Sequence, residues 1–265
     1  MSDVEIKAKT DNVENPEETG KMSFLDHLDE LRKRLIRIAI YLAVGFCLSF
    51  YFSTDIYNFL SESIRHEISR VNGSLQYTNP TAAFIMSMRM ALLASIFVTL
   101  PFTLFEVWKF ISPGLYRREK KYVIPFILSS VLCFVAGAAF CYKIVLPNAF
   151  RFLIEWGEKF EDTTPIIRID EYLSLVSTML VGFGFVFEMP VIVAFLSLFG
   201  LVSAGFLWKN FRYAIVGIVI LAAILSPTGD AFNLMLWSAP MVLLYFISIG
   251  IAAILGRRRK KKGLA

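Results

Sequence analysis

The chain has 265 residues, of which 56% are hydrophobic and 25 are phenylalanine, and its formal net charge is +5. A soluble domain of this length does not need so much apolar surface, and several apolar runs exceed the roughly 18 residues that mark a membrane-spanning helix. The composition therefore excludes a soluble globular protein and predicts a multi-pass membrane protein.

The first 22 residues hold six acids against three lysines and contain no apolar core. We therefore expect residues 1–22 to form a disordered cytoplasmic tail and not a cleaved signal sequence. In the following stretch, "SFLDHLDELRKRL", leucines recur every three or four residues at Leu25, Leu28, Leu31 and Leu35. This spacing predicts an amphipathic helix that lies along the cytoplasmic interface and leads into the first span.

Hydropathy predicts an all-α membrane domain over residues 23–256, with six transmembrane helices. The fifth is short, because thirteen residues reach only about 20 Å, and "SPTGD" (226–230) predicts a tight hairpin between the fifth and sixth. The six predicted spans are Leu35–Phe52, Phe84–Val107, Tyr122–Leu146, Tyr172–Phe199, Tyr213–Leu225 and Phe232–Leu255.

Lysine and arginine are unevenly distributed among the predicted loops. Basic residues flank the first span, fill the loops near residues 109–121 and 209–212, and form a basic tail over residues 257–265. The loop around residues 155–171 is acidic. Positive-inside counting therefore places both termini in the cytoplasm. A nucleic-acid patch is the weaker reading of the C-terminal run, because beside a last span such a run acts as an orientation signal touching anionic lipid.

The sequence lacks the usual motifs of enzymes. It contains no His-Glu-x-x-His zinc motif, no pair of intramembrane aspartates and no phosphate-binding loop. Cys47, Cys133 and Cys141 all fall in apolar runs and fit small core residues. We therefore predict no catalytic activity, no metal and no cofactor.

Several charged residues are candidates for function. Spacing alone favours a local pair between Glu30 and Arg34, four residues apart, and local pairing for Glu119 among its basic neighbours. Arg89 lies about 7–8 Å inside the second span, so it can reach back to the outer interface in a structural role. Glu188 is too deep to do so. With Pro190 kinking its helix two residues later, it should face protein or water, and the pattern favours a functional role.

Four segments together resemble the TatC family, the polytopic receptor subunit of the twin-arginine protein translocase. They are "HLDELRKRL", "VWKFISPGLYRREKK", "GFVFEMP" and "SPTGD", and they occur in the family's order over nearly the whole chain from Ser23 to about Leu255.

The resemblance implies a cupped, concave six-helix bundle in the cytoplasmic (inner) membrane. Glu30 and Glu119 match the family's acids for the twin arginines of a folded precursor's signal peptide, with Arg32 and Phe110 beside them. Both acids thereby gain a role beyond local pairing.

Further roles follow from the same resemblance. Glu188, with Pro190, matches the position that docks the transmembrane helix of a TatA or TatB partner, and Asp230 matches an acid at the outer hairpin. Export driven by the proton-motive force, contact with membrane lipid and self-association are also implied, without a cofactor or nucleic acid.

The chain departs from the family pattern at several positions. Ser63 replaces a usual Pro, Ala82 a common Glu, Asn233 and Leu234 a usual Ser-Gln pair, and Phe246 a common Glu.

Two rival functions compete with this reading. A proton- or cation-coupled small-solute transporter would use Glu188 as its carrier site. Such transporters often contain repeated broken helices, and the Glu-Met-Pro break has no counterpart in the other half of the chain. A pure assembly scaffold would leave the acids among the basic cytoplasmic loops without a role.

Overall fold

The computed structural model describes residues 24–70, 74–77, 79–111, 123–157, 159, 166–225 and 230–261. The predicted disordered tail, Glu119 with the loop 112–122, and most of the predicted hairpin (226–229) lie outside these residues.

The described residues contain five helical segments that are long and apolar enough to cross a membrane, and one shorter apolar helix, Phe211–Ile224. All six coincide with runs predicted from hydropathy, and the prediction of a short fifth helix is confirmed. The five longer segments are Leu25–Tyr51, Ala82–Phe110, Ile124–Gly157, Ile169–Leu198 and Leu234–Arg257.

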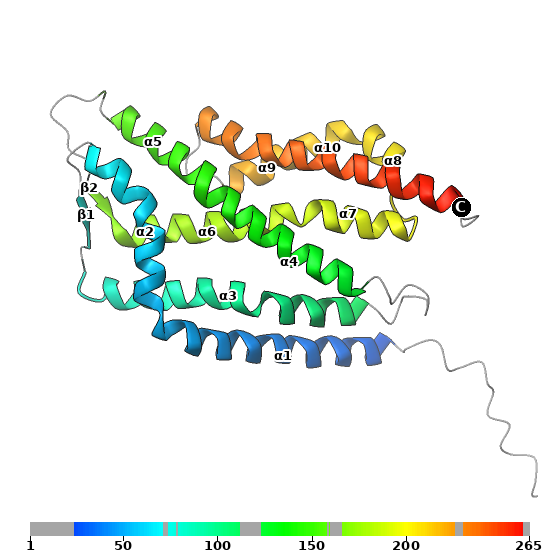
Figure 1. Ribbon diagram of the computed structural model, residues 1–265, viewed down its shortest axis with the longest axis horizontal. Helices are drawn as coiled ribbons and strands as arrows, with labels where there is room; N and C mark the ends of the chain where they lie inside the picture. The colour runs from blue at the N-terminus through cyan, green and yellow to red at the C-terminus, as the bar shows by residue number, and fades with distance from the viewer. Residues whose placement is uncertain are drawn as a thin grey trace, which may run out of the picture.

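The helices α1 (Phe24–Tyr51) and α3 (Ala82–Ile111) lie side by side and antiparallel (Figure 1). Their close approach requires Gly45, because a Cβ atom there would lie 2.6 Å from the Thr99 methyl group. The stretch predicted to lie along the interface instead continues the axis of α1 without a break. His27 and Arg34 of this stretch contact Phe110 and Glu106 of α3, which accounts for the difference. Leu25, Leu28 and Leu35 are exposed on the outside of this helix.

A cap that the sequence analysis did not predict covers one end of the bundle. It contains α2 (Ser53–Arg70) and a two-stranded parallel sheet of β1 (Ser74–Gln76) and β2 (Ile166–Arg168). The buried Tyr172 hydroxyl holds α2 in place by donating a hydrogen bond to the Leu60 carbonyl oxygen at 2.7 Å. We call this end of the molecule the cap end.

Helix α4 (Val123–Phe140) continues through a π-helical turn (Cys141–Val145) into α5 (Leu146–Gly157), which reaches the cap end (Figure 1). Helix α6 (Ile169–Phe187) packs against α4 and is followed by α7 (Met189–Leu198). The chain then forms α8 (Ala204–Lys209), α9 (Phe211–Leu225) and α10 (Ala231–Lys261).

The core runs through the middle of the bundle. Phe183 of α6 and Trp237 of α10 are fully buried, with ring centroids 4.6 Å apart. Many large apolar side chains instead lie on the outside, including Ile40 and Val44 of α1. An apolar exterior of this kind is stable in a bilayer, where hydrocarbon replaces water as the solvent.

The start of α1, the end of α3, α8 and the end of α10 all lie at the end of the molecule opposite the cap (Figure 1). We call it the basic end, because its described part carries Arg32, Lys33, Arg34, Arg37, Lys109, Lys209, Arg212 and Arg257. The start of α1 and the end of α10 therefore share one end of the bundle.

Candidate functional site

A network of charged side chains joins α1 to α3 at the basic end. Arg34 is 7% exposed, and its Nη1 donates to Glu106 Oε2 at 2.9 Å. Its Nε donates to Glu30 Oε1 at 3.1 Å, and its Nη2 contacts the same oxygen. The predicted pair of Glu30 and Arg34 is thus confirmed, but as part of a larger network. Arg37 completes the network by donating to Glu106 Oε2 at 3.4 Å.

Glu106 is a residue that sequence reasoning missed. It lies one residue before the end of the predicted second span, where a lone acid resembles an interfacial residue. Arg34 lies eleven residues before Gly45 on α1, and Glu106 lies eleven residues after Ser95, the neighbour of Gly45 on α3. Eleven residues are about three helical turns, so the antiparallel packing that brings Gly45 against Ser95 also brings Arg34 against Glu106. The sequence offers a lone acid near the end of one apolar run and arginines near the start of another, but which of these residues meet depends on this packing.

Only one of the two carboxylate oxygens of Glu30 forms hydrogen bonds within this network. Its Oε1 is held by Arg34, whereas its Oε2 is buried and receives no hydrogen bond from any described residue. The side chain as a whole is 20% exposed. An unpaired carboxylate oxygen in such a place is costly, and it retains its capacity to accept a hydrogen bond.

Phe110 and Arg32, which the family resemblance places beside the signal-peptide site, are close in sequence to residues of this network. Phe110, in the last turn of α3, stacks on His27 of α1, with ring centroids 4.3 Å apart. Arg32 lies two residues after Glu30 and is exposed. The structure therefore brings Glu30 and Phe110 to the same end of the same helix pair, while Glu119 lies outside the described residues.

Glu188 lies far from this network, at the junction of α6 and α7 near the middle of the bundle (Figure 1). Pro190 falls in the first turn of α7, where its missing N–H group does least harm. The predicted interruption of the helix is confirmed. Glu188 is 8% exposed and forms a side-chain hydrogen bond with Ser130 of α4, while its Oε1 has no partner among the described residues.

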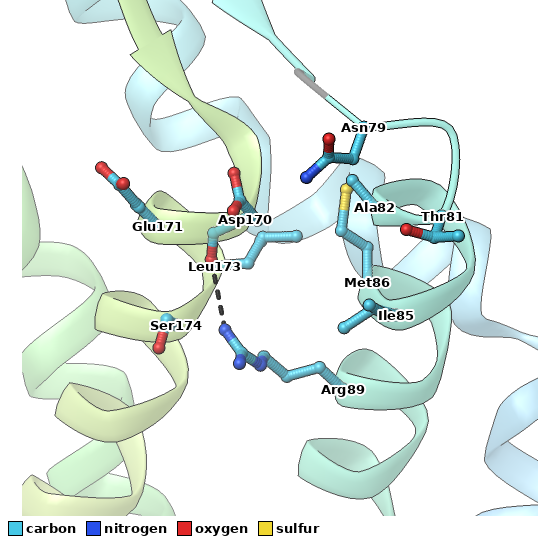
Figure 2. Close-up of a pocket in the computed structure, with 10 residues that line it drawn as sticks. All are labelled: Asn79, Thr81, Ala82, Ile85, Met86, Arg89, Asp170, Glu171, Leu173 and Ser174. Atoms are coloured by element: carbon cyan, nitrogen blue, oxygen red, sulfur yellow. Dashed lines mark hydrogen bonds between the residues drawn. The ribbon is translucent and has the colours of Figure 1, made fainter.

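Arg89 extends from α3 toward the first turn of α6 (Figure 2). Its Nη1 donates to the Asp170 carbonyl oxygen at 3.2 Å, which ties α3 to the first turn of α6 (Figure 2). The two residues line a pocket of about 260 Å³, together with Asn79, Ala82 and Glu171 among others (Figure 2). This contact gives Arg89 a structural role.

Asp230 directly precedes α10, and its carbonyl oxygen accepts a hydrogen bond from the Leu234 N–H at 3.1 Å. Aspartate is favoured at such a position before a helix. Phe246, in place of the common family Glu, packs against Phe211 of α9 with ring centroids 5.2 Å apart. The structure thus separates Asp230 and Glu188 from the charged network of α1 and α3.

Comparisons with known proteins agree on one group. Residues 26–240 match the family described as Sec-independent protein translocase protein (TatC). The chain is 45% identical over 243 residues to a protein of that name from Koribacter versatilis, covering 91% of this chain and 89% of the relative. It is 35% identical over 240 residues to the protein of the same name from Aquifex aeolicus, covering 91% and 98%.

The fold has also been seen in a crystal structure, that of the twin arginine translocase receptor TatC. The two chains are 34% identical and superpose with a TM-score of 0.77, over 86% of this chain and 99% of the other.

Proposed function

This chain belongs to the TatC family of Sec-independent protein translocase proteins, and on that premise we propose that its basic end binds the paired arginines of signal peptides. The family is a translocase component and not an enzyme. Membership of a protein translocase family also favours protein export over the rival transport of a small solute.

The proposal rests mainly on the hydrogen bonding of the Glu30 carboxylate. This acid lies at an end rich in basic residues, with one oxygen held by Arg34 and the other buried without a described donor. A guanidinium group carries several N–H donors in a rigid fork and pairs well with carboxylates. Lysine has no such fork. Glu119 would supply the second acid for the second arginine, and Arg32 and Phe110 would border the site.

We test this proposal by titrating a labelled signal peptide into the purified full chain. Loss of one arginine–carboxylate contact costs about 1.5–3 kcal/mol, or about 10- to 150-fold in affinity. Glu30→Ala and Glu119→Ala should each weaken the Arg-Arg peptide within that range.

The matched control is Asp29→Asn. Asp29 is the neighbouring acid on α1 and pairs with the exposed Lys33 at 2.6 Å, outside the network of Arg34. This variant should bind the Arg-Arg peptide like the unmodified protein. Unchanged affinity in both glutamate variants would refute the proposed recognition.

We also propose that the protein lies in the cytoplasmic (inner) membrane, with both termini and the basic end facing the cytoplasm. The distribution of Lys and Arg supports this orientation. The exposed apolar side chains of the long helices suit contact with lipid, with single-span partners of the TatA or TatB type, and with further copies of the chain. The proton-motive force would drive export.

We assign Glu188 to partner docking. A carboxyl group with an unfilled oxygen in the middle of an apolar bundle can receive a hydrogen bond from another transmembrane helix. Pro190 supports this role by interrupting the helix beside it.

A further inference from the structure

We infer that Glu106 is a positioning residue for signal recognition: it anchors Arg34, so that this arginine occupies only one oxygen of Glu30 and leaves the other without a hydrogen-bond donor among the described residues. The inference rests on the proposed function, because it takes Glu30 as an arginine-binding acid.

The network is a series of alternating charges. It runs from Arg37 to Glu106 (3.4 Å), from Glu106 to Arg34 (2.9 Å), and from Arg34 to Glu30 (3.1 Å). The series ends on the buried Oε2 of Glu30, which has no described donor. A guanidinium group of a bound peptide would therefore add one positive charge to the end of the series, next to the negative charge of Glu30.

Arg34 would be a competitor for the same site if nothing restrained it. A guanidinium group binds a carboxylate best with two parallel N–H donors, one on each oxygen. In the structure Arg34 instead places Nε and Nη2 on the single Oε1 of Glu30 and directs Nη1 at Glu106. With Nη1 held by Glu106, the guanidinium group is fixed in the orientation that places Nε and Nη2 on one oxygen of Glu30.

Glu106 is suited to hold Arg34 in this way. Its side chain is 5% exposed, and that of Arg34 is 9% exposed, so water screens their attraction weakly. Arg37 also contacts Glu106, but its side chain is 50% exposed. The attraction between Glu106 and Arg34 is thus the stronger restraint, and Arg37 adds little to it.

The test measures affinity for a labelled Arg-Arg signal peptide with the purified full chain. Glu106→Gln keeps the size of the side chain and removes its charge, so that Arg34 can turn fully onto Glu30, and affinity should fall by roughly tenfold. The double variant Glu106→Gln with Arg34→Gln removes the competitor as well, and most of the lost affinity should return. A merely structural network predicts the opposite, since a second lost ion pair would weaken the site further.

Arg37→Gln is a second test variant, in which the pair of Arg34 and Glu106 is kept. Its affinity should stay within about threefold of the unmodified protein, because such an exposed pair contributes little. Unchanged affinity in Glu106→Gln would overturn the inference. So would a double variant as weak as Glu106→Gln, or an Arg37→Gln variant that loses as much as Glu106→Gln.

Glu30→Gln, measured in parallel, separates this inference from the proposed function. If Glu30→Gln and Glu119→Ala both bind the peptide normally, the proposed function fails. If Glu30→Gln loses affinity while Glu106→Gln does not, only the positioning role of Glu106 fails.

Discussion

Glu106 and Glu188 are both buried, yet their surroundings differ in kind. Glu106 faces two arginines across a helix pair, so its charge is matched within the protein. Glu188 is bonded to the neutral Ser130 and has an unpaired Oε1. An acid with a matched charge suits a fixed structural network, whereas an acid with an unpaired oxygen suits a hydrogen bond from a second molecule.

Glu188→Ala should weaken assembly with the partner protein and leave binding of the signal peptide nearly normal, because the two sites lie in different parts of the bundle. Hydrogen bonds between transmembrane helices contribute about 0.6–2 kcal/mol, which corresponds to roughly a 3- to 30-fold loss of association. Glu188→Gln should be milder, since an amide still offers hydrogen-bonding groups. Co-purification of the partner, peptide binding and export are measured for each variant.

A proton-carrier role for Glu188 predicts a different pattern. Glutamine cannot exchange a proton, so it would be as damaging as alanine to export. Equal loss of export in the two variants, with partner assembly intact, would contradict the docking role and favour a titrating one.

At the level of the elements, Gly137 and Gly184 allow close packing of α4 and α6. A Cβ atom on Gly137 would lie 2.5 Å from the Phe183 carbonyl oxygen and 2.8 Å from the Phe187 side chain. Gly137→Ala should therefore force the helices apart and lower the free energy of unfolding by about 1–3 kcal/mol.

The matched control for this substitution is Gly217→Ala in α9, where a Cβ atom would meet nothing within 4 Å. It should not lose stability, since alanine is the better helix former. Thermal unfolding of both variants in detergent measures the difference. Equal stability of the two variants would show that α4 and α6 do not need this contact.

The helices and strands also differ in how well they could be predicted from the sequence alone. The long apolar helices were predictable, because hydropathy and length report burial in lipid directly. Helix α2 was missed, since it is too polar for a span and its packing depends on distant residues such as Tyr172. The pairing of β1 with β2 joins segments about 90 residues apart along the chain, and no local pattern encodes it.

The candidate site was predictable only in part. The motif around Glu30 and its local pair with Arg34 are visible in the sequence. The role of Glu106 is not, because it depends on the antiparallel register of α1 and α3, which Gly45 helps to set.

At the scale of the whole molecule, the basic end and the cap of α2, β1 and β2 lie at opposite ends of the bundle (Figure 1). A receptor that reads cytoplasmic signal peptides needs its recognition acids at the end that faces the cytoplasm. Three properties of the proposed receptor are therefore linked: the basic end faces the cytoplasm, Glu30 lies there, and the peptide binds there through paired arginines.

Site-specific photo-crosslinking of a signal peptide tests this link most directly. A photoreactive residue replaces Lys33, an exposed neighbour of Glu30, or Val44, which is also exposed and lies on the same face of α1, eleven residues or about 16 Å further along. We predict that an Arg-Arg peptide added to inverted membrane vesicles crosslinks to position 33 and not to position 44. A Lys-Lys peptide, and either peptide added to right-side-out vesicles, should crosslink weakly. Equal crosslinking at both positions, equal crosslinking of the two peptides, or crosslinking only in right-side-out vesicles would contradict the account.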